Sequence, residues 1–247
     1  MAGNEGFGAL LERFADHRRS GIGALARLAG VSGAELPSLL RGGAPSPSLL
    51  RRLAPALGLH AADLFAIAGV AVPDDLAPVD TRAGRHVPDL VRHTVALPPQ
   101  KRAALRRFAA SLPREERTRP VPVPPVHERY PAGPGALLMR MARNRNLDWS
   151  ATARTFLVLT GRYWSAATYG GIGRGRTRPT PGLLVDFSAV LGVPAGDLAV
   201  LTGVALPGAP PDPGPSAAGV AELIWDVRCL TAHQLQQVIA RAEAMRQ

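Results

Sequence analysis

The chain has 247 residues, which fits one large domain or two small ones, and 46% of them are hydrophobic, enough for a buried core. Its 29 lysines and arginines outnumber 19 acidic residues, and the net charge of +10 favours a polyanionic partner such as nucleic acid. The single cysteine, Cys229, excludes a disulfide framework within the chain and a cysteine-based zinc site. No apolar stretch approaches a membrane span and no signal region opens the chain, so we expect a cytoplasmic protein without a membrane partner.

The sequence repeats itself. Residues 47–73 align without gaps on residues 181–207, and twelve of these 27 positions are identical at an offset of 134. Two further matches flank this one in the same order: residues 8–18 with 135–145 at offset 127, and residues 90–105 with 223–238 at offset 133, the latter in apolar spacing only. Three collinear matches predict a tandem duplication.

Apolar residues recur at helical spacing and no strand-like alternation appears, so the predicted fold is all-α. Each copy is expected to hold about five short helices followed by a helical hairpin. A proline-rich stretch between the copies predicts a semi-rigid linker. In chain order the predicted units are a first module at 1–72, its hairpin at 73–112, the linker at 113–134, a second module with a basic loop at 135–205, and a C-terminal hairpin at 206–247.

The hairpins carry apolar stripes, exemplified by Leu90 and Val91 in the first and by Leu223 and Ile224 in the second. Two arrangements would bury such stripes: each hairpin packs on its own module, or the hairpins form a homodimer interface. Asp63 and Asp197 fall in the first turn of equivalent short helices, where a carboxylate complements the helix dipole.

The first copy contains a recognisable pattern, LARLAGVS at residues 25–32 followed by Leu36, Leu39, Arg41-Gly42, Pro45-Ser46-Pro47 and Leu49-Leu50. It resembles the Cro-like (XRE-family) helix-turn-helix of phage repressors, over about residues 8–70 and, more loosely, 135–204. The resemblance implies two lambda-repressor-like modules in tandem. Gly30 would then turn the chain with a positive φ, Ser32 would cap the third helix, and that helix would enter the major groove of DNA.

The first copy departs from this pattern where recognition would occur. Its third helix would begin with Gly33, Ala34 and Glu35, which offer no side-chain donor, and Pro37 removes an intrahelical hydrogen bond. Arg41, at the end of this helix, is its candidate DNA contact. The alternative is a fold kept for packing, dimerisation or weak backbone contact.

The second copy is better equipped, and its register on the first decides which residues face outward. Offset 128 sets Thr160 against Ser32 and makes Trp164 a core residue; offset 127 would point Trp164 at DNA. We favour offset 128, in which Arg162, Tyr163 and Ser165 lie on the outer face. Near the start of a recognition helix, the Arg162 guanidinium can engage guanine O6 and N7 through two hydrogen bonds.

A glycine-rich loop follows, in which Arg174, Arg176 and Arg178 alternate with small residues. In an extended loop they would lie on one side at about the phosphate repeat, and Arg-Gly-Arg resembles the minor-groove element of an AT-hook. Residues 135–180 hold eight arginines against one acidic residue, so the positive charge concentrates there. The candidate DNA-contacting residues are Thr160, Arg162, Tyr163, Ser165, Arg174, Arg176, Arg178, Arg145 and Arg41.

No catalytic constellation or phosphate loop is evident, and the six histidines fall at no metal-ligand spacing. We therefore expect no enzyme, no metal and no cofactor, and a buried structural thiol at Cys229. The leading hypothesis is a bacterial, nucleoid-associated transcriptional regulator that reads double-stranded DNA mainly with its second module. The alternatives are a protein-interaction or antitoxin-like module on an inherited helix-turn-helix scaffold, and a nonspecific nucleoid protein.

Overall fold

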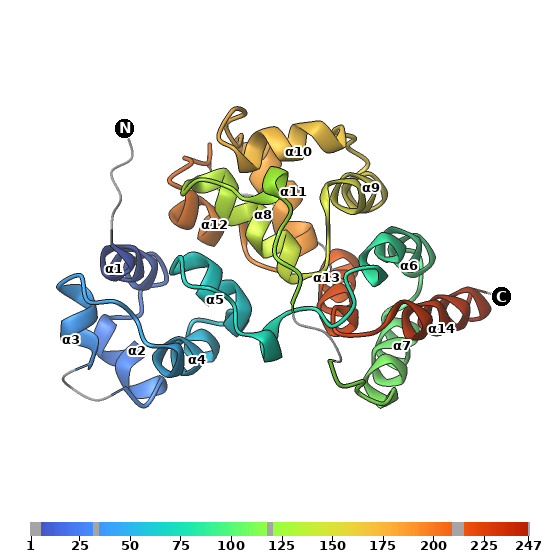
Figure 1. Cartoon of the computed structure of the whole chain (residues 1–247), viewed down its shortest axis with the longest axis horizontal. Coiled ribbons are helices and arrows are strands. Elements are labelled where there is room, and N and C mark those ends of the chain that lie inside the picture. Colours follow the sequence, from blue (N-terminus) through green and yellow to red (C-terminus); the bar gives the residue numbers. More distant parts are fainter. Residues whose placement is uncertain (1–5, 32–34, 118–120, 209–214, 247) are drawn as a thin grey trace.

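The computed structural model describes residues 6–31, 35–117, 121–208 and 215–246, and within these ranges the chain forms helices and no strands (Figure 1). The α-helices are α1 (Phe7–His17), α2 (Ile22–Leu28), α3 (Glu35–Leu40), α4 (Pro47–Ala56), α5 (Ala61–Ile67), α6 (Val87–Thr94), α7 (Pro99–Ser111), α8 (Pro134–Asn144), α9 (Trp149–Thr160), α10 (Ala166–Gly173), α11 (Pro181–Leu191), α12 (Ala195–Thr202), α13 (Pro215–Val227) and α14 (Ala232–Ala244). Short 3₁₀ helices η1 (Asp74–Leu76), η2 (Ala83–His86) and η3 (Val126–Glu128) lie in the connections. The prediction of an all-α fold is confirmed.

The helices fall into four groups. Helices α1–α5 make an N-terminal bundle and α8–α12 a C-terminal bundle. The consecutive helices α6 and α7, and likewise α13 and α14, are called the first and second hairpins here, although each packs mainly on helices of the other pair and little on its own partner. In Figure 1 the N-terminal bundle lies on the left, the C-terminal bundle at the top centre and the hairpins towards the right.

Both bundles close around the same kind of core. Helix α4 buries Leu49, Leu50 and Leu53, and the aligned positions of α11, which include Leu184 and Phe187, are buried as well. Because these side chains recur at helical spacing, each helix presents one apolar face to its bundle. Gly30 takes the left-handed conformation expected of it, with φ +59°. Ser32 lies outside the described residues.

A close helix approach fixes the register between the two copies. A Cβ atom on Gly8 would lie 2.4 Å from the carbonyl oxygen of Leu39, and one on Gly135 would lie 2.0 Å from that of Ile172. Leu39 therefore corresponds to Ile172, and buried Leu36 to buried Tyr169, at an offset of 133. The register at offset 128 is wrong, because α9 has 12 residues where α2 has 7 and the extra residues displace the turn.

The bundles pack on each other reciprocally. Helix α1 contacts α12, and α5 contacts α8. Because α1 is the counterpart of α8 and α5 that of α12, the two contacts are equivalent. Reciprocal contact of this kind is the pattern of an isologous, twofold-related interface, here formed within one chain.

Equivalent polar groups meet at this junction. The guanidinium of Arg145, which follows α8, contacts both carboxylate oxygens of Asp63 at 3.1 and 3.0 Å, and Asn144 Nδ2 donates to Asp63 at 2.9 Å. Arg18, which follows α1, pairs in the same way with Asp197, its Nε lying 3.2 Å from Oδ1. Asp63 and Asp197 therefore do more than complement the dipoles of their own helices: each anchors the opposite bundle.

The hairpins pack on each other as well, α6 against α14 and α7 against α13. Their apolar stripes are almost fully buried by this arrangement: Leu90, Val91, Leu105, Leu223, Ile224, Val227, Leu235 and Val238. The stripes are thus buried within one chain. The second hairpin packs on its own module through α13 and α11, as one of the two expected arrangements has it, whereas the first hairpin packs on the second hairpin and on α9 of the other module. An ion pair adds to the contact between α7 and α13, since Arg106 Nε lies 2.6 Å from Asp226 Oδ2.

The hairpins rest on one bundle only. Helix α6 packs along α9 and α13 packs against α11, and no contact of comparable extent joins a hairpin helix to the N-terminal bundle in the described residues. No single helix in this part of the chain is long and apolar enough to cross a membrane; α11 and α12 reach that length and hydropathy only together, across a bend of 119°.

Candidate nucleic-acid interface

The turn between α9 and α10 carries several of the predicted DNA contacts. Helix α9 ends at Gly161, whose φ of +71° reverses the chain, and α10 begins after Ser165. The hydroxyl of Ser165 accepts a hydrogen bond from the backbone N–H of Thr168 at 3.3 Å, which makes Ser165 the N-cap of α10. At the offset of 133, Ser165 is the counterpart of Ser32, the residue expected to cap the first copy's third helix.

Arg162 and Tyr163 lie in this turn, before α10 rather than on it. Tyr163 is 65% exposed and Trp164 is 39% exposed, so the assignment of Trp164 to the core is wrong. The hydroxyl of Thr160 donates to the carbonyl of Phe156 at 2.8 Å and ends α9, so it is engaged within the protein.

The Arg162 side chain leans on the start of α11. Its Nη1 lies 3.5 Å from both Asp186 Oδ2 and the carbonyl oxygen of Gly182, and 57% of the side chain is exposed. Burial raises the pKa of Asp186, while the positive charge of Arg162 lowers it. These contacts are long, so Arg162 is loosely held and accessible to a ligand.

Helix α10 itself presents few donors. Tyr169 and Ile172 point into the core, and the accessible positions include Ala167, Thr168 and Gly171. Direct readout from α10 would depend on the hydroxyls of Ser165 and Thr168, since alanine and glycine offer no polar side-chain atom.

The arginine loop after α10 is a tight turn. The backbone N–H of Arg176 donates to the carbonyl of Gly171 at 2.9 Å, so the extended, evenly spaced arrangement expected for this loop is wrong. Arg174 is engaged within the protein: its guanidinium lies 5.2 Å from the centroid of the Trp149 ring and donates to the carbonyl of His127 at 3.0 Å. The side chains of Arg176 and Arg178 are exposed and make no polar contact with the described residues.

Two predicted contacts lie elsewhere. Arg145 is fully buried in its pair with Asp63, so the structure gives it a role at the bundle junction and no access to DNA. Arg41 is exposed just after α3, which lies at the left edge of Figure 1, whereas α10 lies at the top. The structure therefore places Arg162, Tyr163 and Ser165 in the α9–α10 turn and Arg176 and Arg178 in the α10–α11 loop, all of them exposed, and leaves Arg41 apart on the other bundle.

No protein-family model, curated protein or solved structure is significantly similar to this chain. Within the described residues, no group of three or more His, Cys, Asp or Glu side chains is placed to hold a metal ion. The functional argument therefore rests on the site itself.

Proposed function

We propose that the chain binds double-stranded DNA as a sequence-selective transcriptional regulator, through the surface made by the α9–α10 turn and the α10–α11 loop. The observation that carries this proposal is the set of exposed cations Arg162, Arg176 and Arg178 beside the starts of two helices. The N-termini of α10 and α11, capped by Ser165 and Thr180, add the positive ends of their dipoles to the same surface.

In this proposal Arg176 and Arg178 neutralise phosphates, because both are exposed and neither is paired with a carboxylate in the described residues. Arg162 supplies selectivity by leaving its 3.5 Å contact with Asp186 for a guanine edge. The proposal retains the Cro-like helix-turn-helix as its frame, with the turn rather than the helix face as the principal contact.

The double variant R176Q/R178Q tests the backbone contacts. We expect weaker binding to every duplex and a log–log salt dependence shallower by about 2, since each neutralised phosphate contributes about 0.9 to the slope. Arg241→Gln, an exposed arginine on α14, is the control for loss of charge. An unchanged salt slope in the double variant would exclude this surface.

Arg162→Ala tests selectivity by enrichment from a randomised duplex library. Arg154→Ala is a closely matched control, because Arg154 is also 57% exposed and also lies 3.5 Å from a single carboxylate, that of Asp89. We expect Arg162→Ala to blunt enrichment of a motif and Arg154→Ala to preserve it. An equal loss of specific and random binding would show that Arg162 contacts only phosphate.

A protein-interaction module is the second candidate, and a specific observation favours it. Leu157, Tyr163 and Trp164 are large apolar residues that are at least 39% exposed near the end of α9, and exposed apolar groups of this kind mark protein interfaces. Binding through them would depend little on salt. Nonspecific nucleoid binding would instead appear as salt-dependent affinity without enrichment of any motif.

A further inference from the structure

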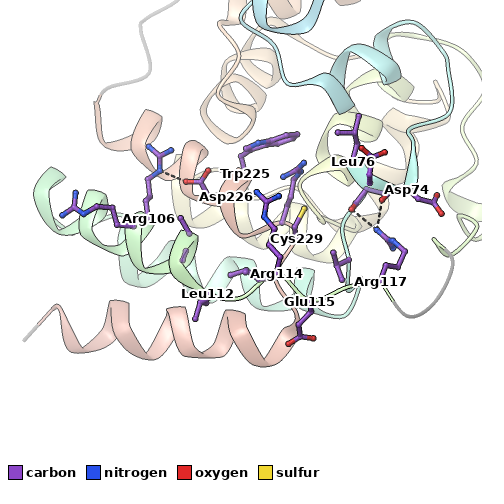
Figure 2. A pocket seen from close by; sticks show the side chains of 18 of the residues that line it. Asp74, Leu76, Arg106, Leu112, Arg114, Glu115, Arg117, Trp225, Asp226 and Cys229 are labelled. Atoms are coloured by element: carbon purple, nitrogen blue, oxygen red, sulfur yellow. Dashed lines mark hydrogen bonds and ion pairs between the residues drawn. The ribbon is translucent and has the colours of Figure 1, made fainter. Parts of the chain in front are cut away.

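A cleft of about 1080 Å³ lies between the hairpins and the segment that follows the N-terminal bundle (Figure 2). Its walls come from η1, from α7 with the residues just after it, and from the end of α13. Five arginines line it: Arg106, Arg107, Arg114, Arg117 and Arg228.

Two of these arginines are fully engaged by the protein. Arg106 pairs with Asp226 and Glu222, and Arg117 donates to the backbone carbonyls of Ala77 and Pro78 at 2.9 Å. The side chains of Arg107 and Arg114 are exposed and have no carboxylate partner among the described residues.

Arg228 is the unusual member of the set. Its guanidinium lies 3.7 Å from the centroid of the Trp225 ring, and its Nε is buried without a hydrogen-bond partner in the described part of the chain. Burial lowers the pKa of Arg228; Cys229 and Asp63 oppose this, while the positive charges of Arg145 and Arg114 add to it.

Four carboxylates also line the cleft, those of Asp74, Asp75, Glu115 and Asp226, but none of them forms an ion pair with Arg114 or Arg228 in the described residues: Asp75 pairs with Arg51 and Asp226 with Arg106. The nearest buried carboxylate, Asp63, already accepts two hydrogen bonds from Arg145 and one from Asn144. Figure 2 shows the side chains of Arg114, Cys229 and Trp225 beside one another in the view, and Arg114 lies close enough for its charge to act on Arg228. Two guanidinium groups that share a partly buried wall repel each other, and an anion placed between them relieves that repulsion.

We propose that this cleft binds a phosphate-bearing small molecule, whose phosphate lies between Arg114 and Arg228 with Arg107 at the entrance. Guanidinium groups bind phosphate oxygens through paired, charge-assisted hydrogen bonds, which the terminal nitrogens of Arg114 and Arg228 would supply. The cleft has room for an organic substituent on the phosphate. This site is separate from the DNA surface proposed above, since no residue of the α9–α10 turn or the arginine loop lines it.

Cys229 provides a direct readout, because it is the only cysteine of the chain, it lines the cleft, and it is half-buried where we expected a buried thiol. The full-length protein is alkylated with iodoacetamide, a neutral reagent, in the presence of increasing inorganic pyrophosphate. We expect pyrophosphate to slow the modification of Cys229 several-fold and in a saturable manner. Sodium chloride at matched ionic strength is expected to leave the rate unchanged.

Arg114→Gln is the decisive variant, because Arg114 is exposed and its replacement leaves the core intact. Protection by pyrophosphate should disappear in Arg114→Gln and persist in Arg241→Gln. Absence of protection in the unmodified chain, equal protection by chloride, or protection that survives Arg114→Gln would each overturn the proposal.

A DNA duplex serves as the competing ligand. If a duplex protects Cys229 while pyrophosphate does not, the cleft belongs to a nucleic-acid surface and the small-molecule proposal is overturned. The loss of DNA binding in R176Q/R178Q is measured independently, so failure of one proposal is distinguishable from failure of the other.

Discussion

The Arg145–Asp63 and Arg18–Asp197 pairs occupy equivalent positions at the bundle junction, yet only the first is fully shielded from solvent. Both side chains of the Arg145 pair are 0% exposed, whereas Arg18 is 26% exposed. The difference comes from the second hairpin. The Trp225 ring lies 5.2 Å from the Arg145 guanidinium, and its centroid is 3.5 Å from that of the His60 ring, on which it stacks. The two rings thus cover the Arg145–Asp63 pair.

In the described residues, the aromatic ring on the equivalent arginine, Arg18, is that of Phe14 from its own helix, at 4.6 Å, and none comes from a hairpin. At the offsets of the repeat, His60 corresponds to Pro194 and Trp225 to Arg92, so neither stacking partner is present there. Two copies of one sequence pattern thus give one ion pair that is fully buried and one whose arginine is partly exposed. The comparison teaches that the environment supplied by a distant helix, rather than the pair itself, sets the energetic cost of breaking it.

The largest expected effect is that of Arg145→Met. The substitution leaves Asp63 buried without its charge partner, so the free energy of unfolding should fall by about 3–5 kcal/mol. The measurement is urea denaturation followed by circular dichroism. Because the side chains are similar in volume, lost packing contributes little.

Arg18→Met is the matched comparison. Solvent can reach the space that the partly exposed Arg18 leaves, and His17 Nε2 stays 3.6 Å from Asp197, so the expected loss is smaller, about 1–3 kcal/mol. Equal losses of unfolding free energy in the two variants would show that the rings of Trp225 and His60 do not change the cost of breaking the Arg145–Asp63 pair.

The close helix approaches at Gly8 and Gly135 should be equally sensitive to substitution in the two halves of the chain. Gly8→Ala and Gly135→Ala each place a Cβ atom against a backbone carbonyl oxygen, at 2.4 and 2.0 Å, which the helices relieve only by moving apart. We expect each to lower the free energy of unfolding by about 1–3 kcal/mol, the usual cost of overpacking.

Gly21→Ala controls for the chemical change, because a Cβ atom there meets nothing within 4 Å. Its unfolding midpoint in urea should be close to that of the unmodified chain. A neutral Gly135→Ala beside a destabilising Gly8→Ala would mean that the close approach, and with it the register at offset 133, does not hold in the second half.

Particular residues show which features of the structure the sequence predicts and which it does not. The helical class follows from local spacing, which a single chain displays directly. The prediction that Arg145 contacts DNA is wrong because its partner, Asp63, is 82 positions away and no local pattern links the two residues. The register that sets Thr160 against Ser32 is wrong because α9 is longer than α2.

Better signals were present in the sequence for the turn. Tyr169 and Ile172 repeat the spacing of Leu36 and Leu39, and Ser165 precedes them as Ser32 precedes the leucines. The exposure of Arg176 and Arg178 agrees with their glycine-rich surroundings. The contact of Arg174 with Trp149 could not be predicted, because it depends on the path of the chain through the linker, where His127 supplies the accepting carbonyl.

The smallest expected effect is a pH dependence of the unfolding free energy, caused by His60, one of the two rings over the Arg145–Asp63 pair. Burial, assisted by the positive charge of Arg145, lowers the pKa of His60 from 6.5 to about 4. Between these values the unfolded chain binds a proton that the folded chain does not, so stability falls as the pH drops from 6.5 towards 4. Allowing for the partial exposure of the ring, we expect a loss of about 1–2 kcal/mol.

His60→Phe isolates this contribution, because phenylalanine keeps the stack on Trp225 and cannot titrate. Urea unfolding of both proteins across this pH range should give a shallower pH dependence for the variant, with the difference confined to the interval between the two pKa values. Parallel curves would mean that His60 is protonated equally in the folded and unfolded states. The ring would then be open to solvent, and the contrast between the two junctions would rest on Trp225 alone.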